Sequence, residues 1–245
     1  MKRPYLIHFL AIESEQNISI RSGIALKKIS PAKIFLFHKE TPSNPLENLN
    51  LLKKKTFIIK IIGINNKKEI IFTKLIETDS FGEINAKIPT INLKDNIFAL
   101  KLFETKSFPK LEINLGTFLP LKILPPKNII ISDFDKTLVD TKYSTSTEIY
   151  KSLTRPINYF PTVNSSVKLI NKFIEQKFHP FIVSASPHFY EKPIRDWLYQ
   201  HKIYTASIFL KDYRKVFSFF QGELSPKDVK IHGLYKLNQI LNIIL

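Results

Sequence analysis

The residues best suited to chemistry are two aspartates, Asp133 and Asp135, which directly follow a short apolar run. That run, residues 128–132, is rich in isoleucine and predicts a strand buried on both faces of a parallel sheet. Ligands of open α/β sheets bind at the carboxyl ends of the strands. One carboxylate in such a crevice can act as a nucleophile, and a second one two residues later can act as acid and base. The alternative is an acidic turn after a strand, because short motifs also match by chance.

The elements that would position these aspartates alternate between strand and helix. Strands are predicted at residues 128–132, 180–184 and within 203–210, and helices at 165–176, 190–201 and 235–245. This alternation predicts a doubly wound parallel sheet with right-handed crossovers. We expect an α/β domain over residues 126–245.

The preceding part of the chain shows a different pattern. Short segments with β-branched and aromatic residues predict strands at residues 5–12, 17–21, 23–28, 32–38, 56–64, 69–76, 83–88 and 96–104. Many short strands with turns between them predict an antiparallel, sandwich-like all-β domain over residues 1–125. Pro125 and Pro126 disfavour helix and stiffen the link, so they mark the boundary between the two domains.

The spacing Asp-x-Asp-x-Thr, here Asp133 to Thr137, resembles motif I of the haloacid-dehalogenase (HAD) phosphotransferases. Those enzymes also use a serine or threonine after the second strand, a lysine, and further acids that hold Mg²⁺. Ser184 is placed to be that serine, although a serine after a strand is ordinarily a cap or turn residue. Lys236 is the best candidate for the lysine, although a helical lysine alone is ordinarily a solvated surface residue.

Three further stretches resemble one HAD-type family more closely. They are Ser-Ala-Ser-Pro at 184–187, Ile-Phe-Leu-Lys-Asp-Tyr at 208–213 and Tyr-Lys-Leu at 235–237. This set is similar to the catalytic domain of the actin-patch-associated phosphatidate phosphatase family and its bacterial relatives. That family also carries a β-rich N-terminal domain, which residues 11–26 and 75–88 resemble, so the similarity covers nearly the whole chain.

The resemblance implies Mg²⁺-dependent removal of phosphate from a lipid phosphomonoester, with phosphatidate giving diacylglycerol. Asp133 would form an aspartyl-phosphate, Asp135 would serve as acid and base, and Lys236 would neutralise charge. Asp133 and the backbone carbonyl of Asp135 would also face the metal. The implied phosphate-binding residues are Thr137, Ser184, Ala185 and Ser186.

The sequence departs from the family pattern in three places. Lys136 stands where the relatives usually carry an acid, and Pro161-Thr162 replaces a Pro-Gly pair. The catalytic domain is also expected to be truncated before a last strand and a Gly-Asp metal motif. Without that strand the apolar run at 129–131 would form an exposed sheet edge. Three explanations stay open: a truncated gene product, a covered edge, or an inactive enzyme.

Composition limits the other classes of function. The absence of cysteine excludes disulfides, zinc-thiolate sites and a cysteine nucleophile. The net charge of +16 is spread over both halves, which favours a solvated basic surface over a nucleic-acid site. An enzyme is favoured, and the alternatives are a non-catalytic phosphate- or anionic-lipid-binding module and a basic nucleic-acid-binding protein.

The sequence also indicates where the protein resides. We expect no signal peptide, because the apolar stretch at residues 5–12 is broken by His8 and followed by Glu13 and Glu15, and the sequence has no run of about 18 apolar residues that could span a bilayer. We therefore expect a cytoplasmic protein that is soluble or peripherally associated with an anionic membrane.

Overall fold

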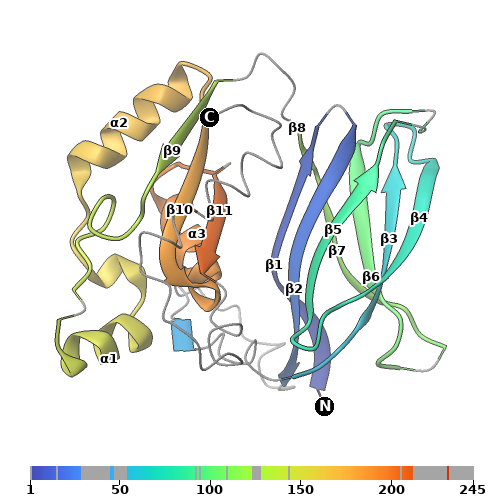
Figure 1. Cartoon of the computed structure of the whole chain (residues 1–245), viewed down its shortest axis with the longest axis horizontal. Coiled ribbons are helices and arrows are strands. Elements are labelled where there is room, and N and C mark those ends of the chain that lie inside the picture. The colour runs from blue at the N-terminus through green and yellow to red at the C-terminus, as the bar shows by residue number, and fades with distance from the viewer. Residues whose placement is uncertain are drawn as a thin grey trace, which may run out of the picture. The chain divides into compact units, whose positions relative to one another are not determined.

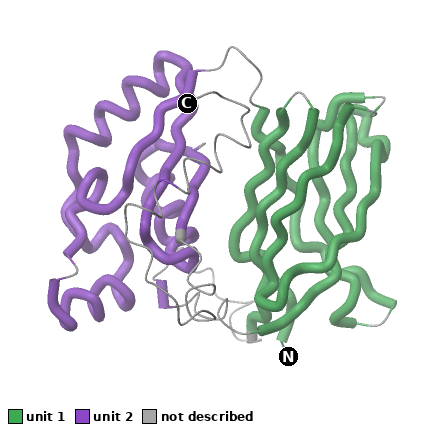
Figure 2. Tube along the Cα trace, viewed as in Figure 1, with its two compact units in different colours: residues 1–37, 50–124 green, residues 38–49, 125–245 purple. Residues whose placement is uncertain are grey.

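The computed structural model divides the chain into two compact units. Unit 1 comprises residues 1–37 and 50–124, and unit 2 comprises residues 38–49 and 125–245 (Figure 2). The structure describes residues 2–14, 16–28, 45–46, 54–91, 93, 95–108, 110–122, 128–142, 144–204, 206–211 and 231. The predicted strand at 32–38 and the predicted helix at 235–245 lie outside these residues.

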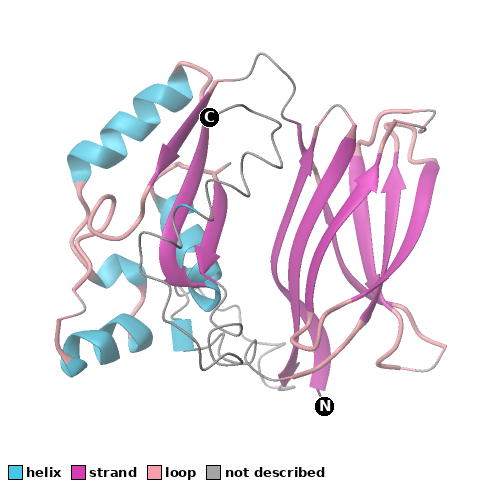
Figure 3. Ribbon diagram, viewed as in Figure 1, coloured by secondary structure: helices cyan, strands magenta, loops and turns pink. Residues whose placement is uncertain are grey.

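Unit 1 is built from two four-stranded sheets (Figure 3). The first sheet has the order β5-β2-β1-β8, with β1 at Lys2–Glu13, β2 at Asn17–Lys28, β5 at Glu83–Pro89 and β8 at Leu121–Lys122. The second has the order β4-β3-β6-β7, with β3 at Ile58–Ile64, β4 at Ile70–Glu77, β6 at Ala99–Glu104 and β7 at Ile113–Phe118. All neighbours are antiparallel except β1 and β8, which are parallel. The predicted β-rich N-terminal region is confirmed.

Both sheets contribute to one hydrophobic core. In β3, Ile59 and Ile61 are fully buried while their neighbours are half-exposed, which is the two-residue period of a strand with one face inward. The same core includes Ile18, Ile20 and Ile24 of β2, Ile84 of β5, and Leu100 and Leu102 of β6. Burial of these alternating side chains therefore holds the two sheets together.

The N-terminal strands are longer than the sequence predicts. Residues 17–21 and 23–28 belong to one continuous strand, β2, so the predicted break between them is wrong. Gly23 lies opposite His8, where the register of β1 shifts. A Cβ on Gly23 would lie 2.5 Å from the His8 ring, so this glycine provides space for the imidazole and does not end the strand.

Unit 2 contains a parallel sheet of order β11-β10-β9, as the alternation of strand and helix predicts. Its strands are β9 at Ile129–Ser132, β10 at His179–Pro187 and β11 at Ser207–Lys211. The helices are α1 at Ser146–Thr154, α2 at Asn164–Glu175 and α3 at Glu191–Gln200, with short 3₁₀ turns η3 at Ile157–Tyr159 and η4 at His188–Tyr190. The finer expectation, a HAD-like doubly wound sheet, stays a prediction.

β9 differs from the sequence prediction in its burial. All four of its residues are half-buried, so the prediction of a strand buried on both faces is wrong. Among the described strands β9 pairs only with β10 and therefore lies at an edge, whereas β10 lies between β9 and β11 and is almost entirely buried. Among the described residues this position agrees with the expectation that the run at 129–131 lies at a sheet edge, but the strand is half-buried and not fully exposed.

Candidate active site

The loop that follows β9 is anchored by Phe134. This side chain is buried and meets the Trp197 ring of α3 edge-on, with 5.3 Å between ring centroids. Its carbonyl accepts a hydrogen bond of 2.9 Å from the N–H of Leu138, and Lys136 adopts a left-handed φ of 60°. We call residues 133–141 the catalytic loop, after the role that the sequence predicts for its two aspartates. Its tight turn holds the two aspartates that flank Phe134 at the carboxyl end of β9.

Three hydroxyl groups donate hydrogen bonds to the carboxylate of Asp135. Ser184 Oγ and Ser186 Oγ, both at the end of β10, donate to Oδ2 at 2.8 Å and 2.5 Å. Thr141 Oγ1 donates to Oδ1 at 2.9 Å. The N–H of Ser186 donates to Ser184 Oγ at 3.0 Å, which fixes the direction in which that hydroxyl can donate. Both oxygens of Asp135 are therefore held by side chains from two separate segments of unit 2.

Asp133 is half-buried at the start of the same loop. Its Oδ1 accepts a hydrogen bond of 2.8 Å from the N–H of Phe134, and its carbonyl oxygen accepts one of 2.8 Å from Ser132 Oγ. These bonds tie the first aspartate to the loop backbone, whereas the second is tied to neighbouring hydroxyls. The two carboxylates of the motif thus have different local environments.

The structure brings some of the predicted site residues together. Asp135, Ser184 and Ser186 form one hydrogen-bonded group, and Ala185 lies between the two serines. Thr137 is half-buried in the loop and its N–H donates to Phe134 O at 3.3 Å. Lys236 lies outside the described residues.

Thr141 was not predicted from the sequence as a site residue. This buried threonine follows the apolar pair Leu138 and Val139, both of which are fully buried. This apolar pair could have indicated the site, because two adjacent apolar residues after the motif imply that the chain folds back against the rest of unit 2. The hydrogen bond from Thr141 to Asp135 spans six positions and depends on that fold-back.

The oxygen donors of the catalytic loop fit a magnesium ion only in part. Among the described residues no three His, Cys, Asp or Glu side chains gather closely enough to hold a metal. Mg²⁺, however, is often held by one or two carboxylates together with water and a substrate phosphate. The Asp133 carboxylate and the Asp135 carbonyl could supply the protein ligands of such a site, in which water and substrate phosphate complete the coordination. They do not suffice for a site in which every ligand comes from the protein.

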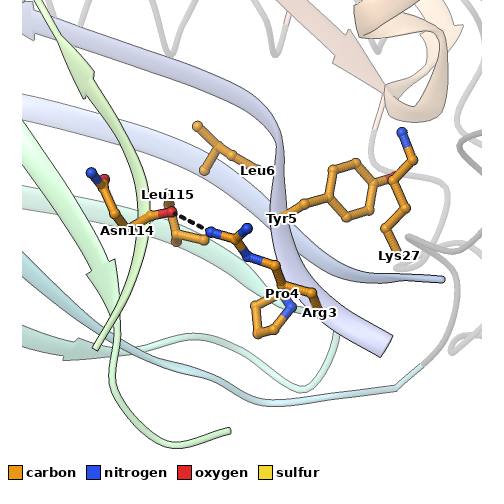
Figure 4. Close-up of a pocket in the computed structure, with 7 residues that line it drawn as sticks. All are labelled: Arg3, Pro4, Tyr5, Leu6, Lys27, Asn114 and Leu115. Carbon is orange, nitrogen blue, oxygen red and sulfur yellow. Dashed lines mark hydrogen bonds between the residues drawn. The ribbon is translucent and has the colours of Figure 1, made fainter. Parts of the chain in front are cut away.

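A separate pocket of about 340 Å³ lies in unit 1 (Figure 4). Lys27 Nζ lies 5.3 Å from the centroid of the Tyr5 ring, and an Arg3 guanidinium nitrogen donates to the carbonyl of Asn114 at 3.4 Å. The remaining lining residues are Pro4, Leu6 and Leu115. This pocket contains none of the predicted catalytic residues, and its two cations suit an anionic ligand.

Comparison with known proteins supports the interpretation of unit 2. Residues 128–243 match the family model described as phosphatidate phosphatase APP1, catalytic domain. This match supports the family predicted from the motifs for this part of the chain. No curated protein matches the sequence.

Solved structures give only a distant likeness. One is the β-glucuronidase of Parabacteroides merdae with glycerol in its active site, with 9% identity, a TM-score of 0.29, and coverage of 97% of this chain and 32% of that one. Another is β-glucuronidase 2 of Bacteroides uniformis bound covalently to a cyclophellitol aziridine, with 10% identity, a TM-score of 0.24, and coverage of 98% and 32%. The chain thus spans about a third of these enzymes, and the low scores carry no argument about fold or activity. Among the described residues no helix is long and apolar enough to cross a membrane.

Proposed function

We propose that unit 2 is a HAD-type phosphatase domain that hydrolyses the phosphomonoester of a lipid of the phosphatidate class. The observation that carries this proposal is the group of hydroxyls around Asp135 at the carboxyl ends of β9 and β10. Phosphoryl transfer depends on positioned groups and on donors that stabilise charge on the phosphoryl oxygens. Ser184 and Ser186 are donors of this kind, and the match to the phosphatidate phosphatase family agrees with such a substrate.

In the proposed first step, an oxygen of Asp133 attacks phosphorus and the bond between phosphorus and the lipid oxygen breaks. Asp135 donates a proton to that leaving oxygen, and diacylglycerol departs. In the second step, Asp135 takes a proton from water, which attacks the phosphorus of the aspartyl-phosphate. The bond between phosphorus and Asp133 breaks, so inorganic phosphate leaves and both carboxyl groups return to their starting forms.

The serines have a second role in this proposal. Each hydroxyl that donates to Asp135 can rotate and donate to a phosphoryl oxygen once the substrate arrives. Such a rotation would leave an oxygen of Asp135 open for proton transfer. Asp133 and the carbonyl of Asp135 would hold Mg²⁺, which offsets phosphoryl charge when bound. Lys236 is proposed, from the family resemblance, to supply a further positive charge.

The test is phosphate release from phosphatidate in detergent micelles with Mg²⁺. Replacing the nucleophile with Asp133→Asn should lower kcat at least about a thousandfold. Asp140→Asn is the matched control, because this aspartate lies in the same loop with an exposed side chain. Chelation should abolish the activity, and added Mg²⁺ should restore it. Equal rates for wild type and Asp133→Asn would remove Asp133 from the mechanism.

The pocket in unit 1 favours a second candidate function, a non-catalytic module that binds anionic lipid. Arg3 and Lys27 are both exposed and border an apolar floor, which suits a ligand with an anionic head and an apolar body. In that case the protein would sediment with phosphatidate vesicles without releasing phosphate. The double variant Arg3→Gln, Lys27→Gln would then weaken binding, whereas Asp133→Asn would not.

A further inference from the structure

A segment of unit 2 leaves the catalytic loop and returns to it. The N–H of Asp140 donates to Pro161 O at 2.8 Å, and Val139 forms an antiparallel bridge with Thr162. The N–H of Val163 then donates to Leu138 O at 2.9 Å. The segment between these bonds carries α1 and η3. Its base is therefore the same loop that holds Asp135, and its position relative to the site is fixed by backbone hydrogen bonds.

One side of this segment packs inward and the other is exposed. Ser152 Oγ and Tyr190 Oη share a buried hydrogen bond of 3.2 Å, which ties α1 to the turn after Ser186. Tyr150 and Tyr159, by contrast, are 66% and 53% exposed. Together with two exposed cations of the same segment they make up what we call the docking face, which consists of Tyr150, Lys151, Arg155 and Tyr159.

The docking face is positively charged. Lys151 and Arg155 are exposed, and the Arg155 guanidinium lies 5.5 Å from the centroid of the Tyr159 ring. The segment from 144 to 160 contains one acid, Glu148. Its carboxylate accepts hydrogen bonds from the N–H groups of Ser144 and Thr145 at the start of α1, so it is held at the helix cap. The two cations outnumber this acid, and the chain as a whole carries +16, which suits an anionic partner.

We propose that the docking face binds the anionic surface of a phospholipid bilayer and so holds the active site towards its lipid substrate. This inference rests on the proposed function. Tyrosine side chains favour the boundary between headgroups and hydrocarbon, and cations beside them are attracted to anionic headgroups. In Figure 1, α1 lies on the side of the sheet towards which the arrowheads of β9 and β11 point, which is also the side of Ser184 and Asp135. A lipid bound at this face would therefore lie near the catalytic loop.

The test is sedimentation of the full chain with phosphatidylcholine vesicles, with and without phosphatidylserine. We expect binding only to the anionic vesicles, and at least about tenfold weaker partitioning for Tyr150→Ser with Tyr159→Ser. The matched control is Tyr199→Ser with Tyr204→Ser, because these tyrosines of the same unit are 67% and 56% exposed. The control should bind like wild type.

A second variant removes the two cations of the docking face and leaves its tyrosines in place, so it tests the face without aromatic substitutions. Lys151→Gln with Arg155→Gln should weaken binding at least about tenfold, because each cation near an anionic surface contributes substantially. Lys168→Gln with Lys172→Gln removes two exposed lysines of α2 and should leave binding unchanged. Equal binding by the face variants and their controls would overturn the proposal, as would equal binding to neutral vesicles.

Hydrolysis of a soluble phosphomonoester separates this inference from the proposed function. If both are correct, the face variants lose vesicle binding and phosphatidate hydrolysis in vesicles but hydrolyse p-nitrophenyl phosphate at the wild-type rate. Vesicle binding that depends on the face, without hydrolysis of either substrate, would contradict the phosphatase alone. A dimer that the tyrosine variant dissociates, with unchanged vesicle binding, would assign the face to a second copy of the chain.

Discussion

Three side-chain hydroxyls donate hydrogen bonds to the carboxylate of Asp135 in the catalytic loop. A hydrogen bond to a charged group contributes about 1.5–3 kcal/mol net, so three of them hold this carboxylate in one orientation. Orientation matters for a group that exchanges a proton with the substrate or with water, because small displacements of a reacting group lower the rate steeply. The hydroxyls around Asp135 are therefore expected to orient its carboxylate as well as to bind the phosphoryl group.

A substitution at Thr141 can test whether these hydrogen bonds orient Asp135. Thr141→Val keeps the shape of the side chain and removes the donor to Asp135 Oδ1, so the carboxylate loses one of the hydrogen bonds that hold it in place. We expect kcat on a soluble phosphomonoester to fall about tenfold with little change in KM, since the substrate is still held by the serines. Thr141→Ser keeps the hydroxyl and should retain most of the rate. Equal losses in both variants, or a loss confined to KM, would contradict a positioning role.

His201 provides a prediction on pH. Burial lowers the pKa of His201 below its ordinary value of 6.5, and its ring centroid lies 4.1 Å from that of Trp197. Because the unfolded chain then binds this proton more readily, stability is complete above about pH 6.5 and decreases as the pH falls below it. The melting temperature of wild type should drop between about pH 7.5 and pH 5.5. His201→Gln should show a smaller drop, and an identical drop would exclude His201 as its cause.

At the scale of elements, α1 depends on its cap. It has nine residues, which is too short for stability from helix propensity alone. Glu148 N–H donates to Thr145 Oγ1 at 3.2 Å, and Thr145 N–H donates to Glu148 Oε2 at 3.1 Å, so the two residues form a capping box. This reciprocal pair sets where the helix begins and, with it, where the docking face lies.

Removal of the cap should loosen α1 measurably. Thr145→Ala should lower the free energy of unfolding by about 1 kcal/mol in urea titrations followed by circular dichroism. The control is Thr147→Ala, at an exposed position within the same helix. This substitution should not lower the free energy of unfolding, because alanine has the higher helix propensity. If Thr145→Ala leaves unfolding unchanged, the capping box contributes nothing to stability.

At the scale of the whole molecule, the dominant property is the net charge of +16. The field of such a charge attracts anionic surfaces and is screened over about 10 Å at 0.1 M salt and about 3 Å at 1 M. It adds a general attraction to the local contacts of the docking face. The two contributions differ in their response to salt, because the tyrosines act by burial and the cations by Coulomb attraction.

Salt should therefore weaken the association with membranes. We expect partitioning onto anionic vesicles to fall at least about tenfold between about 0.05 M and 0.5 M NaCl. Hydrolysis of soluble p-nitrophenyl phosphate should change much less over the same range. Vesicle binding that is independent of salt would contradict an electrostatic contribution and leave burial of the aromatic side chains as its source.

The sequence by itself determined the elements and the motif. Isoleucine-rich runs and alternating strand and helix patterns predicted the strands of unit 2, and short β-branched segments predicted most strands of unit 1, because these patterns are local properties of the chain. Asp135 and Ser184 were predicted from their positions after strands and Ser186 from the family resemblance, and the structure places the three within hydrogen-bonding distance.

Only the tertiary structure decided how these pieces meet. Thr141 reaches Asp135 because the loop folds back, β9 is half-buried because it lies at an edge of the described sheet, and β2 runs on through Gly23 because His8 fills the space opposite. Each of these depends on a partner elsewhere in the chain. Local sequence patterns record which face of an element is apolar, but the identity of the neighbour on that face is set by the fold.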